Sequence, residues 1–313
     1  MTRRAWVGIG LLLSLCMVLP ALADDSYIST ASIFELGVSA RALGMGGALI
    51  ALADDEAAVF YNPAGLPQLS KTRFSSLFTR PFGVYSYGVL GVAERGWGAY
   101  GLILDSDTLE EHDLYGNSTG NFRYTSTGLL LGWGHRLTGN FSLGLQVKGY
   151  GLAYPTRGFG LALSPAILFQ EGPRSYGIVW RNILNTGTRF SDDHMEPWIS
   201  DMAVGLAWRF DKLTYCIDFT ENLITRGDIR CVRMGCEYTG FDPIVLRAGT
   251  NRDWSSVGGS VHWKDLRIDF VYLLHYALPD SYIVSLSYES TTSPTAELLK
   301  ALSWLGSLLG IAL

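Results

Sequence analysis

Large apolar side chains recur at every second position over much of this chain. From Met202 to Phe210, each large apolar residue is followed by Ala, Gly or Arg before the next one. The same alternation returns at residues 257–263, 268–274 and 282–288. A period of two belongs to a β-strand with one apolar face. The pattern therefore predicts a protein built mainly from strands.

The residues between these apolar positions indicate the kind of sheet. They include Ser256, Gly258 and Ser260 in one segment, and Arg267 and Asp269 in the next. The exposed face of a soluble sheet is usually rich in Lys, Glu and Thr. A face of small residues with scattered charges suits the interior of a barrel whose outer face meets lipid.

Strand number and length agree with a membrane barrel. Most segments approach the roughly 9–11 residues that a tilted membrane strand needs, and bacterial barrels have an even number of strands. The sequence predicts an all-β fold, an antiparallel transmembrane β-barrel of about fourteen strands over residues 72–290. We expect strands at 72–80, 84–94, 97–105, 124–137, 141–154, 159–170, 175–184, 200–210, 213–220, 229–240, 243–252, 255–264, 266–275 and 280–290.

The connections between these strands sort by length. Tight turns alternate with connections that include three long ones, at 106–123, 185–199 and 221–228. Outer-membrane barrels have short periplasmic turns and longer external loops, so we expect a bacterial outer-membrane protein with both termini in the periplasm. Aromatic residues near strand ends are expected to form interfacial belts: Trp97, Tyr124, Tyr154, Trp198, Phe210, Trp254, Trp263 and Tyr276.

Both ends of the chain differ from the barrel. Arg3 and Arg4 precede an apolar stretch, and Ala21-Leu22-Ala23 fits the small-x-small rule, which predicts a signal peptide over residues 1–23. Residues 291–313 carry leucines at helical spacing after a proline, which predicts an amphipathic helix at the inner leaflet or on a periplasmic partner.

Composition narrows the partners. Hydrophobic residues make up 48% of the chain and charged residues only 17%. After the predicted cleavage the chain keeps 22 basic and 29 acidic residues, a net charge of −7. This balance argues against nucleic acid as a partner, whereas outer-membrane lipid is expected as one.

Residues 24–71 do not alternate. Asp54 can cap a short helix that runs through Tyr61, and Pro63 and Gly65 would end it. A stretch of small residues with short helices, placed before a barrel, is of a size to enter the lumen as a hatch. The alternative is a loose periplasmic arm.

Two blocks of this segment carry a family resemblance. Gly37-Val38-Ser39-Ala40-Arg41-Ala42-Leu43-Gly44-Met45-Gly46-Gly47-Ala48, and Ala53-Asp54-Asp55 with Tyr61-Asn62-Pro63-Ala64-Gly65-Leu66, closely resemble the start of PorV/PorQ-type outer-membrane proteins. These are related to FadL-like transporters of long-chain fatty acids. The likeness covers most of residues 33–289. It implies a fourteen-stranded barrel with an N-terminal hatch, and its hatch or gate residues here are Arg41, Gly44, Gly46, Gly47, Asp54, Asp55, Asn62, Pro63 and Gly65.

Strand parity points several charged residues into the lumen. Candidate lining residues are Arg209, Arg233, Glu237, Arg247, Ser260 and Asp269. They form either a polar lining that receives the hatch or a structural ladder of paired charges. Cys216 and Cys231 share the inward parity, which allows either a disulfide between them or free thiols.

Two functions follow as alternatives. The first is passive passage of small hydrophobic compounds, gated by the hatch with Asn62-Pro63 as its hinge. The second is a non-enzymatic scaffold or shuttle for a periplasmic partner in protein secretion, as in the PorV branch. We expect no enzyme, cofactor or metal, because the histidines lie in no catalytic or metal-binding pattern: His112, His135, His194, His262 and His275.

Overall fold

The computed structural model describes residues 31–112, 115–154, 156–222 and 229–290. The predicted signal peptide and the predicted C-terminal helix lie outside these residues. Within the described part, no helix is long and apolar enough to cross a bilayer.

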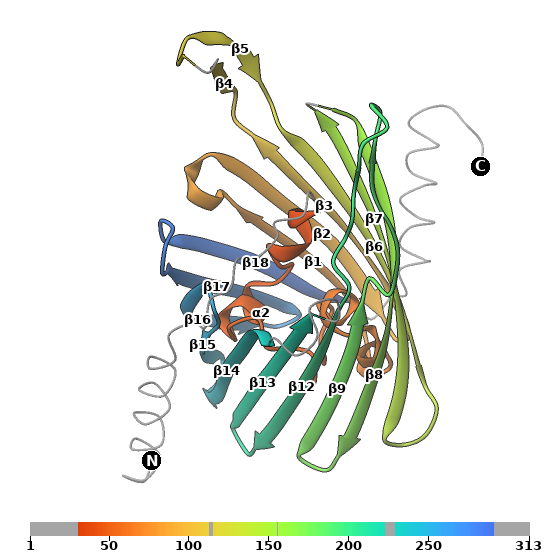
Figure 1. Cartoon of the computed structure of the whole chain (residues 1–313). Coiled ribbons are helices and arrows are strands. Elements are labelled where there is room, and N and C mark those ends of the chain that lie inside the picture. Colours follow the sequence, from red (N-terminus) through yellow and green to blue (C-terminus); the bar gives the residue numbers. More distant parts are fainter. Residues whose placement is uncertain (1–30, 113–114, 155, 223–228, 291–313) are drawn as a thin grey trace, which may run out of the picture.

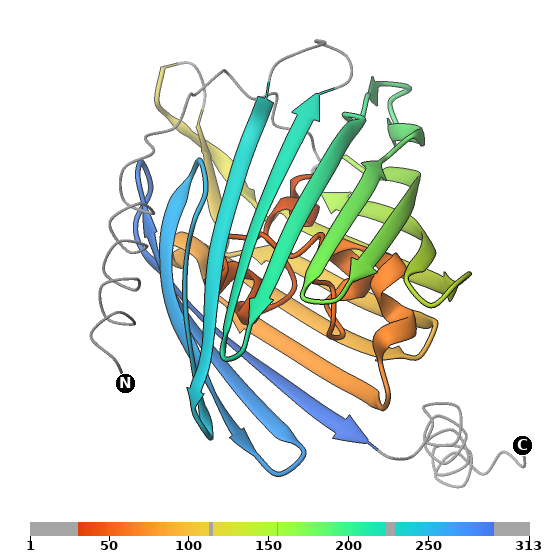
Figure 2. The same cartoon turned by 90° about the horizontal axis from the view of Figure 1, so that it is seen from below.

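Fourteen antiparallel strands close into one barrel (Figures 1 and 2). The ring is completed where the first strand pairs with the last and where β8 pairs with β9. The strand bounds agree closely with those predicted from the alternation. The ring consists of β1 (Thr72–Thr79), β2 (Tyr85–Glu94), β3 (Trp97–Ser106), β6 (Thr125–Arg136), β7 (Phe141–Tyr154), β8 (Gly158–Glu171), β9 (Arg174–Arg181), β12 (Asp201–Phe210), β13 (Leu213–Asn222), β14 (Ile229–Phe241), β15 (Ile244–Thr250), β16 (Trp254–Trp263), β17 (Leu266–His275) and β18 (Ser281–Ser290).

The apolar face of the strands points outward. Val257 is 52% exposed and Val284 is 45% exposed, whereas Ser256 and Ser285, their neighbours of opposite parity, are buried. No second sheet covers the outer face among the described residues. A soluble sandwich would bury these side chains between its sheets, so the prediction of a transmembrane barrel with an apolar outer face is confirmed.

The two ends of the barrel differ. At the short-turn end, β2 and β3 are joined by Arg95-Gly96, and β16 and β17 by Lys264-Asp265. Lys264 adopts a positive φ of 55°, as tight hairpins require. The connections at the opposite, long-loop end include the predicted long ones. The barrel part of the chain begins and finishes at the same end, because β1 starts and β18 ends at the short-turn end.

Two long loops contain strands that the alternation did not reveal. β4 (Leu109–His112) and β5 (Ser118–Phe122) form a hairpin that projects beyond the barrel (Figure 1). β10 (Leu184–Phe190) pairs with β8 and with the two-residue β11 (Met195–Glu196).

The connection after β11 turns into the barrel. Trp198 is only 4% exposed and packs with luminal side chains. Its assignment to an interfacial belt is therefore wrong. Tyr124 and Trp254 also pack against the buried core rather than on the outer face, whereas Phe210, Trp263 and Tyr276 are exposed. The position of an aromatic residue near a strand end indicates its depth in the membrane. It does not indicate whether the ring faces the lipid or the lumen, least of all when the residue lies in a loop.

Residues 31–71, called here the luminal segment, lie inside the barrel (Figure 2). They contain η1 (Ser32–Glu35), α2 (Ala40–Gly44), α3 (Ala58–Tyr61) and η2 (Pro63–Gln68). The only further short helix described, η3 (Pro81–Gly83), belongs to the β1–β2 loop. α2 packs on β15 to β18, whereas α3 and η2 pack on β3, β6 and β7.

Small wall residues allow this close approach. A Cβ at Gly134 would overlap the carbonyl oxygen of Pro63, and one at Gly144 would overlap the backbone of Ala64. The glycine content of the strands thus leaves room for a second layer of chain within the lumen.

One substitution tests the outward face. Val284→Arg, in the middle of β18, places a charge in hydrocarbon and should destabilise the barrel by about 2–4 kcal/mol. Urea unfolding in lipid vesicles measures this loss. The matched control, Tyr288→Arg, lies on the same face nearer the short-turn end and should lose only about 0–1 kcal/mol. Equally small losses for both variants would contradict a lipid-facing surface.

Candidate functional site

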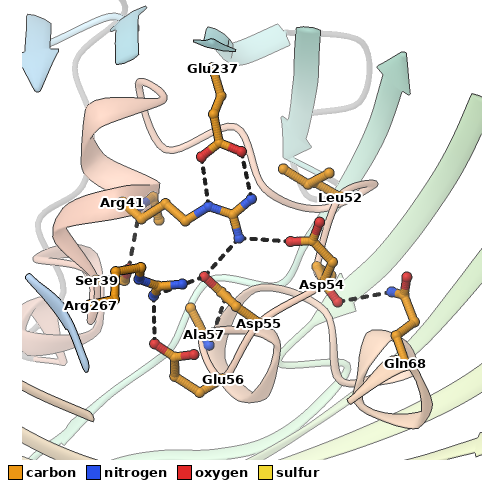
Figure 3. A network of polar contacts seen from close by, with 12 residues as sticks. Ser39, Arg41, Leu52, Asp54, Asp55, Glu56, Ala57, Gln68, Glu237 and Arg267 are labelled. Atoms are coloured by element: carbon orange, nitrogen blue, oxygen red, sulfur yellow. Dashed lines mark hydrogen bonds and ion pairs between the residues drawn. The ribbon is translucent and has the colours of Figure 1, made fainter. Parts of the chain in front are cut away.

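The luminal segment meets the wall through the guanidinium of Arg41 on α2 (Figure 3). Its Nη1 donates to Asp54 Oδ1 at 2.7 Å and to Asp55 Oδ2 at 2.8 Å. Its Nε and Nη2 each donate to a carboxylate oxygen of Glu237 on β14, both at 2.9 Å. Arg41 thus ties two parts of the luminal segment to each other and to the wall through a bidentate pair, a strong geometry.

Two wall arginines extend this arrangement. Arg247 on β15 donates to Glu237 Oε2 at 2.6 Å and to Asp269 Oδ1 at 3.0 Å. Arg267 donates to the other oxygen of Asp269 at 2.9 Å and to Glu56 Oε1 at 2.7 Å. Strands β14, β15 and β17 therefore share one chain of ion pairs with the luminal segment.

Further pairs carry the same chain around the lumen. Arg209 on β12 lies 3.3 Å from Asp54 Oδ2, and Arg73 on β1 lies 3.6 Å from Glu56 Oε2. Arg73 also pairs with Glu289 at 2.6 Å. We call the whole set the ion-pair network. Its five arginines and six carboxylates are Arg41, Arg73, Arg209, Arg247, Arg267, Asp54, Asp55, Glu56, Glu237, Asp269 and Glu289.

The balance of charge explains why so many ions can be buried. Desolvating one ion costs several kcal/mol, and removing its partner leaves that cost uncompensated. Here each carboxylate of the network lies within 4 Å of at least one arginine. Lys71 at the rim adds a further cation, whose Nζ lies 3.1 Å from Glu289 Oε2. The network carries nearly equal numbers of positive and negative charges. Its ion pairs join the luminal segment to strands β1, β12, β14 and β17.

Two acids of the luminal segment respond to this environment in opposite ways. Burial acts to raise the pKa of Asp55, but Arg41 and Arg267 outweigh it and lower that pKa to about 2. Burial raises the pKa of Glu56, with the neighbouring Asp55 adding to the rise against the lowering by Arg267. Of these two acids, Asp55 is therefore the one whose charged form the arginines stabilise more strongly.

The Asn62-Pro63 block is tied to the barrel wall. Asn62 Nδ2 donates to the carbonyl oxygens of Ile50 at 2.8 Å and Ile167 at 3.1 Å, and its Oδ1 accepts from Ala64 N at 3.0 Å. Asn62 is fully buried. These bonds anchor η2 to β8, with Pro63 at its first turn. The role of Asn62-Pro63 as a hinge stays a prediction.

The predicted helix cap is also corrected. α3 begins only at Ala58, and Asp55 Oδ1 accepts from Ala57 N at 3.0 Å. Asp54 does not cap this helix, because its carboxylate faces Arg41 and Arg209. The sequence signal for a cap was real, but it belongs to the second aspartate.

The predicted glycines let the backbone lie against the wall. Gly46 and Gly47 have φ values of 64° and 82°, and a Cβ on Gly46 would come within 2.6 Å of Thr250 N. Gly44 and Gly46 offer their carbonyl oxygens to Ser256 Oγ at 3.2 Å and Asn251 Nδ2 at 3.1 Å. Gly65 instead packs against the backbone of Ala53 within the luminal segment.

Two predicted lining residues, Arg233 and Ser260, lie outside the network. Arg233 donates to Thr220 Oγ1 at 2.8 Å, and Ser260 Oγ is buried without a hydrogen-bond partner among the described residues. Cys216 and Cys231 are free thiols: Cys216 lies opposite Gly235, and Cys231 opposite Thr220. This register separates the two cysteines along the hairpin, so the disulfide alternative is excluded.

The network contains residues that were not predicted as part of the site. Arg267 has the same parity as Asp269 and could have been found from it. Glu56 and Arg73 could not, because only the folded luminal segment brings them together. Asp218 on β13 was also missed: it is fully buried, and its Oδ2 accepts from Ile50 N at 3.0 Å.

The network's contribution to stability can be tested at its shared carboxylate. Glu237→Gln leaves Arg41 and Arg247 buried with reduced compensation and should lower stability by about 3–5 kcal/mol. Urea unfolding and protease cleavage within residues 31–71 both report the change. Asp107→Asn, which breaks the exposed pair with Arg80, is the matched control and should change stability by about 0–1 kcal/mol. Loss of the same size in both variants would contradict a network role.

Acid should release the luminal segment. Because the pKa of Asp55 is lowered from 3.8 to about 2 in the folded state, its contribution is complete above about pH 4 and is lost as the pH falls towards 2. Glu56, with a raised pKa, acts in the opposite direction. Pepsin cleavage within residues 31–71 should increase over this interval, and Asp55→Asn should flatten the dependence. An unchanged pH profile in Asp55→Asn would refute this assignment.

Comparisons with known proteins support the fold. No protein-family model matches the sequence, and no curated protein is significantly similar to it. Among solved structures, the toluene transporter TodX of Pseudomonas putida is 12% identical, with a TM-score of 0.56 over 82% of this chain and 98% of that chain. A TodX monoaromatic hydrocarbon channel deltaS2 mutant is 13% identical, with a TM-score of 0.54 over 82% and 99%. At such identities the likeness shows a shared barrel fold, and the resemblance to PorV/PorQ proteins stays a prediction.

Proposed function

We propose that this protein is a bacterial outer-membrane channel that passes small hydrophobic compounds, with the luminal segment as its gate. The observation that carries the proposal is the uneven lining of the lumen. Every strand residue of the ion-pair network lies within five positions of the short-turn end of its strand.

The long-loop half has a different character on the arc from β7 through β3, β2, β1 and β18 to β17. Its inward-facing residues are largely apolar and buried, whereas the interior of a water-filled porin is polar. The apolar ones are Leu77, Tyr87, Val89, Leu102, Leu104, Tyr150, Leu152, Val271, Leu273 and Ile283, and the buried polar ones among them are Thr79, Ser106, Ser126, Lys148 and Ser281. A compound of low polarity entering from the long-loop end would meet this surface before it meets the network.

The luminal segment then forms the barrier. It is held on the β14 to β17 side by ion pairs and on the β6 to β8 side by close backbone packing. Ion pairs in a nearly neutral group can exchange partners as the segment moves. The solved structures that share this fold include a toluene transporter and a monoaromatic hydrocarbon channel, which supports the same class of compound here.

A tether across the gate tests this function. A Cβ at Gly44 would lie 3.7 Å from Val271 Cγ2, so Gly44→Cys with Val271→Cys can form a disulfide, once the cysteines at 216, 231 and 236 are replaced by serine. The oxidised protein in liposomes should take up a hydrophobic fluorescent probe at about a tenth or less of its reduced rate, because a closed gate cannot be bypassed.

The control is the protein with serine at all three native positions, which should be insensitive to oxidant. Equal uptake by the oxidised, reduced and 31–69-deleted proteins would overturn gating by this segment. Absence of uptake in every form would overturn transport itself. A scaffold or shuttle role in protein secretion, which needs no open lumen, would then replace it.

A further inference from the structure

Gly128 on β6, Tyr150 on β7 and Gly160 on β8 lie side by side on the lumen wall, with the large residue between two glycines. Tyr150 pairs with Gly128 on one side and with Gly160 on the other. A Cβ at Gly128 would lie 2.8 Å from Phe34 Cε1, and one at Gly160 would lie 2.6 Å from Trp198 Cζ2. Each glycine therefore leaves a space beside Tyr150, and an aromatic ring from elsewhere in the chain fills it.

The three rings meet edge to face. Their centroids are 6.4 Å apart for Phe34 and Tyr150, 6.0 Å for Phe34 and Trp198, and 6.1 Å for Tyr150 and Trp198. The interplanar angles lie between 61° and 79°. This is a favoured arrangement for aromatic pairs.

Two of the rings are anchored, and the third is not. Trp198 Nε1 donates to Thr188 Oγ1 at 2.8 Å, and the hydroxyl of Tyr150 lies 3.2 Å from that of Tyr124. Phe34 has no polar group to anchor its ring, and it comes from η1, the first described turn of the luminal segment. Tyr150 from the wall and Trp198 from the loop therefore form an anchored cage. The ring inside it comes from the luminal segment, where no polar group anchors it.

The cage also contains a cation that has no carboxylate in contact with it within the part of the chain that the structure describes. Lys148 on β7 is 6% exposed, and its Nζ lies 5.5 Å from the centroid of Phe34. Its hydrogen bond goes to Asn182 Oδ1 at 3.3 Å, and no carboxylate of the described residues lies within 4 Å of it. Buried ammonium groups are normally paired. The two carboxylates whose charge acts on Lys148 are those of Asp201 and Glu35, and both lie beyond that distance, so a directly contacting anion is missing from the described ranges.

We propose that Gly128, Lys148, Tyr150, Gly160 and Trp198 form a binding site for a small aromatic acid, in which Phe34 is the resident stand-in for the ligand's ring. The ring of the ligand would take the place of the Phe34 ring, edge-on to Tyr150 and Trp198. Its carboxylate would supply the missing partner of Lys148. This inference deepens the proposed function by naming a substrate class and a site.

Competition between Phe34 and the ligand follows directly. In the native protein the site is open only while η1 is displaced, so the apparent affinity is reduced by the fraction of time that Phe34 occupies the cage. Removing the Phe34 ring should restore the full affinity without any new contact.

Equilibrium dialysis of radiolabelled benzoate against the full chain in lipid nanodiscs tests the site. Phe34→Ala should bind benzoate about ten-fold or more tightly than the native protein, because the internal competitor is gone. Phe60→Ala, the same change elsewhere in the luminal segment, is the matched control and should bind as the native protein does. Phe34→Leu, a smaller perturbation, should give an intermediate gain.

A second arm separates the ring from the charge. In the Phe34→Ala background, Lys148→Met should reduce benzoate binding about ten-fold or more, while toluene binding is kept. Adding Gly128→Leu instead should abolish both by filling the cage. Equal benzoate affinity in Phe34→Ala, Phe60→Ala and native protein, or an unchanged preference for benzoate over toluene in Lys148→Met, would overturn the proposal. Because binding is measured without transport, its failure is distinct from a failure of uptake in liposomes.

Discussion

The structure depends on the need to neutralise charges within a closed barrel. An arginine or carboxylate that faces the lumen and is covered by the luminal segment has little water to solvate it, so it needs a nearby counter-ion or, as at Asp218, a hydrogen bond. Arg41 meets this need for three carboxylates at once. Without it, Glu237 would keep only Arg247, and Asp54 would keep only Arg209. The position of α2, which carries Arg41, therefore decides how these buried carboxylates at the short-turn end are paired.

This constraint also explains the division of the lumen. The charges can be buried together only where the luminal segment brings Asp54, Asp55 and Glu56 to the arginines of the wall. Farther from the short-turn end the segment presents apolar side chains instead, such as Ile33 and Phe34, and the wall facing them is largely apolar, with Lys148 as the charged exception. A single chain segment thus matches a charged surface at one level and an apolar surface at the next.

Much of the barrel could be predicted because strand geometry is local. A side-chain period of two and short turns place all fourteen strands within a few residues, and parity correctly directs Arg247, Ser260 and Asp269 into the lumen. Parity cannot say which charges meet, because Glu56 reaches Arg267 only through the path of the luminal segment. Nor can it place Trp198, whose loop turns inward against a glycine on another strand. The same limit applies to Asn62, whose anchor on β8 is far away in sequence.

The two holding regions of the luminal segment can act in sequence rather than together. Phe34 and Arg41 are separated by Gly37, which has a φ of 77° and whose carbonyl oxygen accepts from the hydroxyl of Tyr87 at 2.8 Å. Ahead of this glycine, η1 is held by ring and apolar contacts, whereas α2 behind it is held by ion pairs. Local opening follows the weakest set of contacts, so η1 can leave the cage while Arg41 keeps the network intact. Under the proposed gating, opening of the cage at the long-loop end would precede disruption of the charged half, and the barrier to small molecules would be retained until α2 itself moves.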